Sequence, residues 1–143
     1  MDPSVRAGLP RVLIVEDDPS LRRLLEIRLS VDGYETRAAR DGAAALEELA
    51  IWTPDAVLTD LMMPRLSGLD LCRAIRGDAC TAAIPIILLT ARFLDDEISP
   101  VLQLGAITFM SKPFDAKALD DALRAAMAGR SSELSRGLPG VAS

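Results

Sequence analysis

The stretch "AVLTDLMMPRLSG", residues 56–68, puts a single acid at the point where a buried strand breaks into a loop. Its apolar start, at 56–58, is typical of a strand in the protein interior. The acid, Asp60, follows at once, and the methionines, proline and glycine after it indicate a loop that leads into a helix. A carboxylate at this position is held by a rigid strand end, so the neighbouring strands decide what it faces.

The same pattern, a short apolar run followed by a helical segment, recurs along the chain. We expect strands at 11–15, 34–39, 54–59, 84–90 and 106–111. We expect helices from an Asp18 cap to Gly33, and then at 41–50, 68–76, 92–104 and 115–127. This alternation predicts a parallel sheet with helices on both faces. The apolar first, third and fourth strands belong at its centre and the polar second strand at an edge, which gives the order 2-1-3-4-5 of a doubly wound, flavodoxin-like α/β fold.

Length and composition favour one domain, which we place at residues 10–128, with an extension at 1–9 and a flexible tail at 129–143. The net charge of −5 and the lack of a Lys/Arg run exclude nucleic-acid binding as the main activity. The chain has no histidine, which excludes a Ser-His-Asp triad. Its two cysteines form no CxxC pair, and it has neither a signal peptide nor an apolar run long enough to span a membrane. We therefore expect a cytoplasmic protein with free thiols.

Three carboxylates should meet at the switch point of this sheet, because Glu16 and Asp17 follow the first strand and Asp60 ends the third. Two carboxylates about 4 Å apart repel each other by roughly 4 kcal/mol at an effective dielectric constant of 20. A divalent cation would offset this repulsion, and ligands that are all oxygen suit Mg²⁺. The alternative for the "EDD" run at 16–18 is helix capping, which we assign to Asp18 alone.

The fourth and fifth strands end in Thr90 and Lys112, at the same edge of the sheet as the acids. Lys112 is one of only two lysines among sixteen basic residues, and an ammonium is a compact charge suited to one phosphoryl oxygen. Together these groups describe phosphoryl transfer to a carboxylate. Asp60 would attack phosphorus, while the metal, Thr90 and Lys112 would neutralise the oxygens of the transition state.

Four segments carry a resemblance to a known family: "VLIVEDD", "AVLTDLMMPRLSGLDLCRAIR", "IPIILLTA" and "LGAITFMSKPF". In this order and spacing, from Arg11 to Met127, the chain resembles the receiver domain of bacterial two-component response regulators. The resemblance implies that a histidine kinase or a histidine phosphotransfer protein phosphorylates Asp60. It implies Mg²⁺ bound by Asp17, Asp60 and the Met62 backbone carbonyl, with Glu16 acting through water. It also implies that Lys112 contacts the phosphoryl group, that Thr90 and Phe109 form a switch pair, and that the Lys112–Pro113 bond is cis.

Two features of this chain differ from many relatives. Met62 and Arg92 stand where the family places side chains that border the attacking water, and neither can act as a base, so we expect slow self-dephosphorylation. Pro100 falls inside the expected helix at 92–104, where it either breaks the helix or starts a shorter one behind Ser99.

The leading hypothesis is a stand-alone receiver, since only residues 129–143 follow the last expected helix and are too few for an output domain. Such a receiver is a switch and not an enzyme, apart from transfer to and hydrolysis from its own Asp60. It would control an unknown output protein and exist as a monomer or a weak phosphorylation-dependent dimer. Alternatives are a fragment of a larger regulator and a phosphorylation-independent scaffold. A phosphatase of the haloacid-dehalogenase type needs an acid at position 62, where this chain has methionine.

Overall fold

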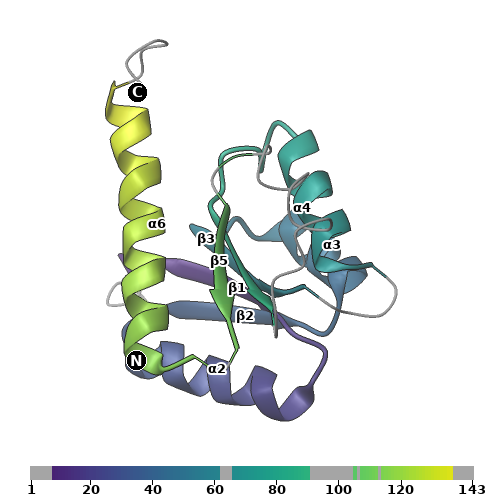
Figure 1. The fold of residues 1–143 in the computed structure, drawn as a ribbon. Coiled ribbons are helices and arrows are strands. Elements are labelled where there is room, and N and C mark those ends of the chain that lie inside the picture. Colours follow the sequence, from purple (N-terminus) through teal and green to yellow (C-terminus); the bar gives the residue numbers. More distant parts are fainter. Residues whose placement is uncertain (1–7, 62–65, 91–104, 106, 113, 137–143) are drawn as a thin grey trace.

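The computed structural model describes residues 8–61, 66–90, 105, 107–112 and 114–136. All five strands are parallel and form one sheet in the order β2-β1-β3-β4-β5, which confirms the predicted topology (Figure 1). The strands are β1 (Arg11–Val15), β2 (Glu35–Ala39), β3 (Ala56–Asp60), β4 (Ile86–Thr90) and β5 (Ile107–Ser111). Each lies within the range predicted for it, except that β3 includes Asp60 itself.

Within the described residues, four helices cover the two faces of the sheet: α2 (Pro19–Val31), α3 (Gly42–Ile51), α4 (Gly68–Gly77) and α6 (Ala116–Arg136). In Figure 1, α2 and α6 lie on one side of the strands and α3 and α4 on the other. Successive strand residues point to opposite faces, so β1 supplies Val12 and Ile14 to the core beneath α2 and α6, and Leu13 and Val15 to the other core. Burial on both faces explains why β1, β3 and β4 are apolar without alternation.

Side-chain caps fix where the helices begin. The Asp18 carboxylate accepts a hydrogen bond from the Ser20 amide at 2.9 Å, in front of the proline that opens α2. Asp41, Ser67 and Asp115 cap the other three helices in the same way. Gly33 follows α2 with a φ of 98°, a conformation that glycine adopts without strain. The assignment of Asp18 as a helix cap is confirmed.

Helix α6 continues through Arg136, whereas the sequence predicted that it ends at Met127 and that a flexible tail starts at 129. Residues 129–136 are therefore helical. A glycine at 129 costs about 1 kcal/mol in a helix but does not end it, and the segment "SSELSR" after it contains residues that a helix tolerates. The predicted helix at 92–104, with Ser99 and Pro100, lies outside the described residues. Among the described helices, none is long and apolar enough to cross a membrane.

A polar cluster ties α6 to the start of β2. The Tyr34 hydroxyl donates a hydrogen bond of 2.7 Å to Asp120, and Arg124 holds the same carboxylate at 3.1 Å while its guanidinium lies 5.6 Å from the centre of the Tyr34 ring. The hydrogen bond from Tyr34, together with Arg124, holds the pKa of Asp120 below its ordinary value. Burial and the nearby carboxylate raise the pKa of the Tyr34 hydroxyl.

We expect Tyr34→Phe to lower the free energy of unfolding by about 1 kcal/mol at pH 7, because it removes this hydrogen bond and keeps the ring. Asp120 has a depressed pKa when folded, so its contribution is complete above the unfolded pKa of about 3.9 and is lost as the pH falls through the folded value. The difference between wild type and variant should therefore shrink in acid. Urea unfolding at pH 7 and pH 3 measures this, and a difference that is equal at both values would contradict it.

Candidate functional site

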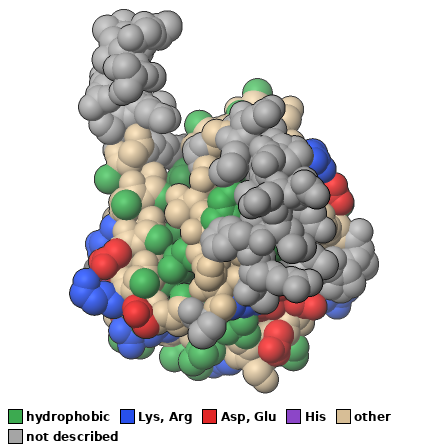
Figure 2. Space-filling view, viewed as in Figure 1, with side chains coloured by type: hydrophobic (Ala, Val, Ile, Leu, Met, Phe, Trp, Pro, Cys, Tyr) green, Lys and Arg blue, Asp and Glu red, His purple; other side chains and the backbone are tan. Residues whose placement is uncertain are grey.

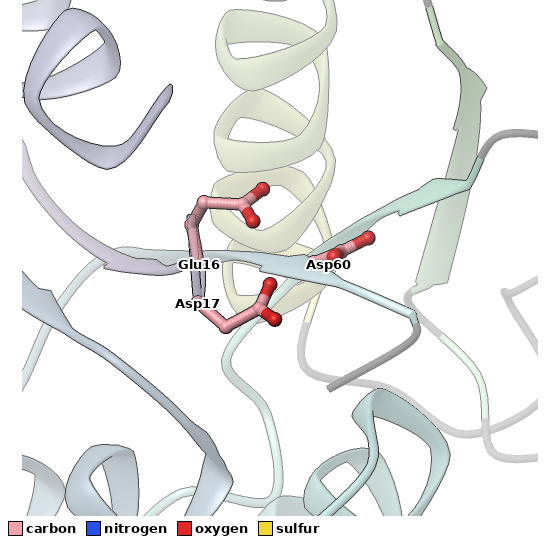
Figure 3. A group of neighbouring side chains, drawn as sticks. All are labelled: Glu16, Asp17 and Asp60. Atoms are coloured by element: carbon pink, nitrogen blue, oxygen red, sulfur yellow. The ribbon is translucent and has the colours of Figure 1, made fainter. Parts of the chain in front are cut away.

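Three carboxylates from two neighbouring strand ends meet at the carboxyl edge of the sheet (Figure 3). Glu16 and Asp17 directly follow β1, and Asp60 is the last residue of β3. One carboxylate oxygen from each lies within 4.8 Å of the others. Glu16 and Asp60 are buried, whereas Asp17 is exposed. The structure therefore brings together the acids that the sequence placed at the switch point.

Lys112 bridges two of these acids. Its Nζ lies 3.3 Å from Glu16 Oε1 and 3.2 Å from Asp60 Oδ1. The residue directly follows β5, and its backbone amide donates to the Thr90 carbonyl at 2.7 Å, which fixes its position against β4. Burial lowers the pKa of the ammonium, but attraction to the two carboxylates outweighs it, so the pKa lies above its ordinary value. Lys112 is thus a stable cation against both acids.

Both buried acids are hard to ionise. Burial raises the pKa of Asp60, which Lys112 partly lowers and the charge of Asp17 raises again. Burial likewise raises the pKa of Glu16, against a hydrogen bond from the Asp18 amide. Lys112 lowers the pKa of both acids but does not offset the combined effect of burial and of the neighbouring carboxyl groups. The donors are all carboxylate oxygens, a set that suits a hard divalent cation such as Mg²⁺.

Thr90 and Phe109 lie on the same face of the sheet. Thr90 is the buried last residue of β4, pairs with Ser111 in the β4–β5 register, and continues the alternation that points Leu88 toward α3 and α4. Phe109 pairs with Leu88 and packs against the same core. The two predicted switch residues are therefore diagonal neighbours on adjacent strands.

Several predicted features lie outside the described residues: Met62 with its backbone carbonyl, Arg92, and the cis bond before Pro113. The structure also adds two residues that the sequence analysis missed. Gly68, the first residue of α4, donates its amide to the Leu61 carbonyl at 2.9 Å and leaves no room for a side chain beside Asp60. Arg22 donates to the Glu16 carbonyl at 2.9 Å. Neither contact has a signal in the sequence, because each depends on how a loop folds back.

Comparison with known proteins gives a consistent result. The sequence model of the response regulator receiver domain matches residues 12–124. DNA-binding response regulator MtrA of Mycolicibacterium smegmatis is 40% identical over 115 residues, which cover 80% of this chain and 49% of MtrA. Response regulator MprA of Mycobacterium tuberculosis is 42% identical over 115 residues, with the same coverage. The chain spans about half the length of these relatives.

Solved structures agree with this result. Chemotaxis protein CheY4 of Vibrio cholerae superimposes with a TM-score of 0.79 at 28% identity, over 83% of this chain and 99% of CheY4. The signal receiver domain of a histidine kinase from Syntrophus aciditrophicus gives 0.77 at 32% identity, over 84% of this chain and 91% of that domain. The family predicted from the sequence is therefore confirmed: this chain belongs to the response regulator receiver domain family.

Proposed function

We propose that this protein accepts a phosphoryl group on Asp60 from a phosphohistidine of a kinase or phosphotransfer protein, in a reaction that requires Mg²⁺, and that phosphorylation changes how it binds a partner. The observation that carries the proposal is the position of Asp60. It is a buried carboxylate at a rigid strand end, 3.2 Å from a lysine and within one cluster with two other acids. A solvated surface acid has none of these neighbours.

The chemistry follows from these neighbours. A carboxylate oxygen of Asp60 attacks phosphorus, the bond from phosphorus to the donor imidazole breaks, and the imidazole keeps the electron pair. Lys112, freed from the carboxylate by the new O–P bond, is within reach of a phosphoryl oxygen at the same place. Thr90 can donate its hydroxyl from the adjacent strand. Transfer of this kind depends on positioning and charge neutralisation more than on covalent help from the protein.

The acidic cluster fits a magnesium ion. Glu16, Asp17 and Asp60 offer oxygens close enough to share one cation. The resemblance to the family adds the Met62 backbone carbonyl, which lies outside the described residues. Burial raises the pKa of Glu16 and of Asp60, and a bound cation would favour the charged form of both. When bound, the ion would neutralise charge on the transferring phosphoryl group. The protein itself contributes the fixed arrangement of its carboxylates.

The proposed switch uses Thr90 and Phe109. A phosphoryl group on Asp60 would draw the Thr90 hydroxyl toward it, and the space that this movement leaves lies on the face where Phe109 packs. One ligand would thereby bias two arrangements of β4 and β5. NMR shifts along the described part of β5 on adding a phosphoryl mimic test this step.

The output of the whole protein is a separate matter. One alternative is that this chain works within a longer regulator, because the matched region covers only about half of the curated relatives and MtrA is described as DNA-binding. This chain itself carries a net charge of −5. On the face viewed in Figure 2, the Lys and Arg side chains that are coloured stand beside acidic ones and form no continuous basic patch. With the net charge, this favours our proposal that the chain recognises a partner protein and not DNA.

The direct test is incubation with a small acyl phosphate, with and without Mg²⁺, followed by mass spectrometry of the peptides. Phosphorylation confined to the peptide that contains Asp60, and dependent on the metal, is expected. Labelling elsewhere, or labelling that persists in excess chelator, would refute the assignment.

Removing the charge of Lys112 is expected to strengthen Mg²⁺ binding and to slow phosphorylation. In Lys112→Met we expect Mg²⁺ to bind several-fold more tightly, because a cation that competes for Glu16 and Asp60 is gone. Labelling by an acyl phosphate should nevertheless slow by about 100-fold, the loss typical of one donor to a transition-state charge. Calorimetry and single-turnover labelling measure the two effects.

The matched control is Lys117→Met, which removes the other lysine of the chain. Lys117 is exposed on α6, and its ion pair among the described residues is with Asp121, at 3.0 Å. We expect this control to behave as the wild type in both measurements. Equal slowing in both variants would mean that net charge, not the position of Lys112, governs the rate.

A further inference from the structure

Every polar group of Glu16, in the backbone and in the side chain, forms a hydrogen bond. Its amide donates to the Ala39 carbonyl at 3.0 Å, and its carboxylate accepts from the Asp18 amide at 3.1 Å and from Lys112 at 3.3 Å. The remaining group is its backbone carbonyl, which accepts from Nη1 of Arg22 at 2.9 Å. The contacts with Ala39 and Asp18 involve backbone groups, whereas Arg22 and Lys112 donate to Glu16 from their side chains.

The carbonyl of Glu16 and the amide of Asp17 belong to one planar peptide unit. A hydrogen bond to that carbonyl therefore sets the plane from which the Asp17 side chain departs. Asp17 is exposed, and its side chain lies beside the Glu16 carboxyl group, whereas Glu16 and Asp60 are buried. Arg22 is thus in a position to direct the one exposed acid of the cluster toward the other two.

We propose that Arg22 is a positioning residue for the cation site: through the Glu16 carbonyl it orients Asp17 for binding a divalent cation. This inference rests on the proposed function and deepens it. Arg22 lies on α2, one turn after the Asp18 cap, and its backbone amide donates to the Asp18 carbonyl at 2.9 Å. Arg22 thus contacts the residues on either side of Asp17: its side chain bonds to Glu16 and its backbone amide bonds to Asp18.

The surroundings of Arg22 allow the residue to be changed without disturbing the core. Its side chain lines an open polar cavity of about 550 Å³ together with Arg40, Glu47 and Glu48. A shorter side chain would leave space that water can fill, so truncation creates no dry void. A change in Mg²⁺ binding on truncation of Arg22 can therefore be attributed to the lost hydrogen bond to Glu16.

Charge and position predict opposite results at this residue. Arg22 is a cation near a cation site, so its charge alone weakens Mg²⁺ binding, and removing it should strengthen binding. If Arg22 orients Asp17, removing it should weaken binding instead, since partners that orient metal ligands typically contribute 10–100-fold in affinity. The sign of the change therefore separates the two roles.

The experiment compares Arg22→Met with Arg23→Met by calorimetric titration with MgCl₂. Both remove one positive charge from the same turn of α2. Arg23 is exposed, and within the described residues it has no hydrogen bond or ion pair. We expect Mg²⁺ to bind about tenfold more weakly to Arg22→Met, and to bind unchanged or slightly more tightly to Arg23→Met. Arg22→Lys, which keeps a charged donor, should recover most of the loss.

A second measurement is independent of the metal. The amide resonance of Asp17 in the metal-free protein should shift in Arg22→Met and stay in place in Arg23→Met. Unchanged Mg²⁺ affinity in a folded Arg22→Met, or equal weakening in both variants, would overturn the inference. If the wild type binds no Mg²⁺ while the Asp17 resonance still depends on Arg22, the proposed function fails and the positioning contact stands. If Arg22→Met is unfolded at room temperature, the test uses the Asp17 amide resonance of Arg22→Lys instead. We expect that resonance at the wild-type chemical shift, and a displaced resonance would contradict the inference.

Discussion

Replacing Asp60 with asparagine is expected to abolish labelling by a small acyl phosphate. The amide has the shape of the carboxylate but not its negative charge, so its oxygen is a poor nucleophile, and the cation cluster loses one of its three carboxylates. The fold should not suffer. Burial raises the pKa of Asp60, so the charged side chain costs free energy in the folded protein at neutral pH, and a neutral amide removes that cost. We therefore expect the free energy of unfolding at pH 7 to be unchanged or higher.

The sign of this stability effect can be checked against pH. A carboxyl whose folded pKa is raised contributes stability below its unfolded pKa of about 3.9 and loses it as the pH rises through the folded value. The advantage of Asp60→Asn should accordingly be larger at pH 7 than at pH 4. Asp121→Asn, which removes an exposed acid on α6, serves as the control and should label as the wild type. Acid-stable labelling of Asp60→Asn at the wild-type rate would exclude Asp60 as the acceptor.

Replacing Gly68 with alanine is expected to cause a large loss of stability. A Cβ at this position would overlap the backbone carbonyl oxygen of Asp60 and lie 2.9 Å from Cα of Leu61. Both obstacles are backbone atoms, which cannot rotate away as a side chain can. Forcing an extra methyl group into such a contact costs up to about 3 kcal/mol. Because the backbone of Asp60 must shift, labelling should also slow, by about 100-fold for a displacement near 1 Å.

Gly77 provides the matched control for this substitution. It is the last residue of the same helix, and a Cβ there would meet nothing within 4 Å. Alanine is favoured over glycine in helices by up to about 1 kcal/mol, so Gly77→Ala should be neutral or stabilising and should label normally. Chemical unfolding and labelling rates of the two variants measure the contrast. Similar behaviour of both would show that the end of β3 tolerates movement at Gly68.

Most of the fold could be predicted because its signals are local. Short apolar runs gave the strands within about two residues, and Asp18 with Pro19 gave the start of α2. The polar character of β2 placed it at the sheet edge, since burial on both faces requires apolar residues on both. The predicted end of α6 was wrong, because glycine at 129 destabilises a helix without ending it. The sequence alone does not show whether the turns after the glycine stabilise the helix enough to offset this cost.

Part of the candidate site could likewise be predicted from local signals, and part could not. Parallel strands place their carboxyl ends at one edge, so an acid after β1, an acid at the end of β3 and a lysine after β5 could be grouped before any distance was known. The roles of Arg22 and Gly68 could not be predicted in this way. Arg22 is an ordinary exposed-face helix residue by pattern, and Gly68 is an ordinary glycine at a helix start.

The sequence by itself determined the layer architecture, the strand order and which polar residues share an edge, because each follows from periodicity, burial and the geometry of parallel strands. Only the tertiary structure decided which atoms touch. Lys112 reaches both Glu16 and Asp60, across 96 and 52 positions of the chain. Such contacts depend on differences of about an ångström in how loops leave the strands, and those differences are set by the packing of the whole domain, which no local pattern records.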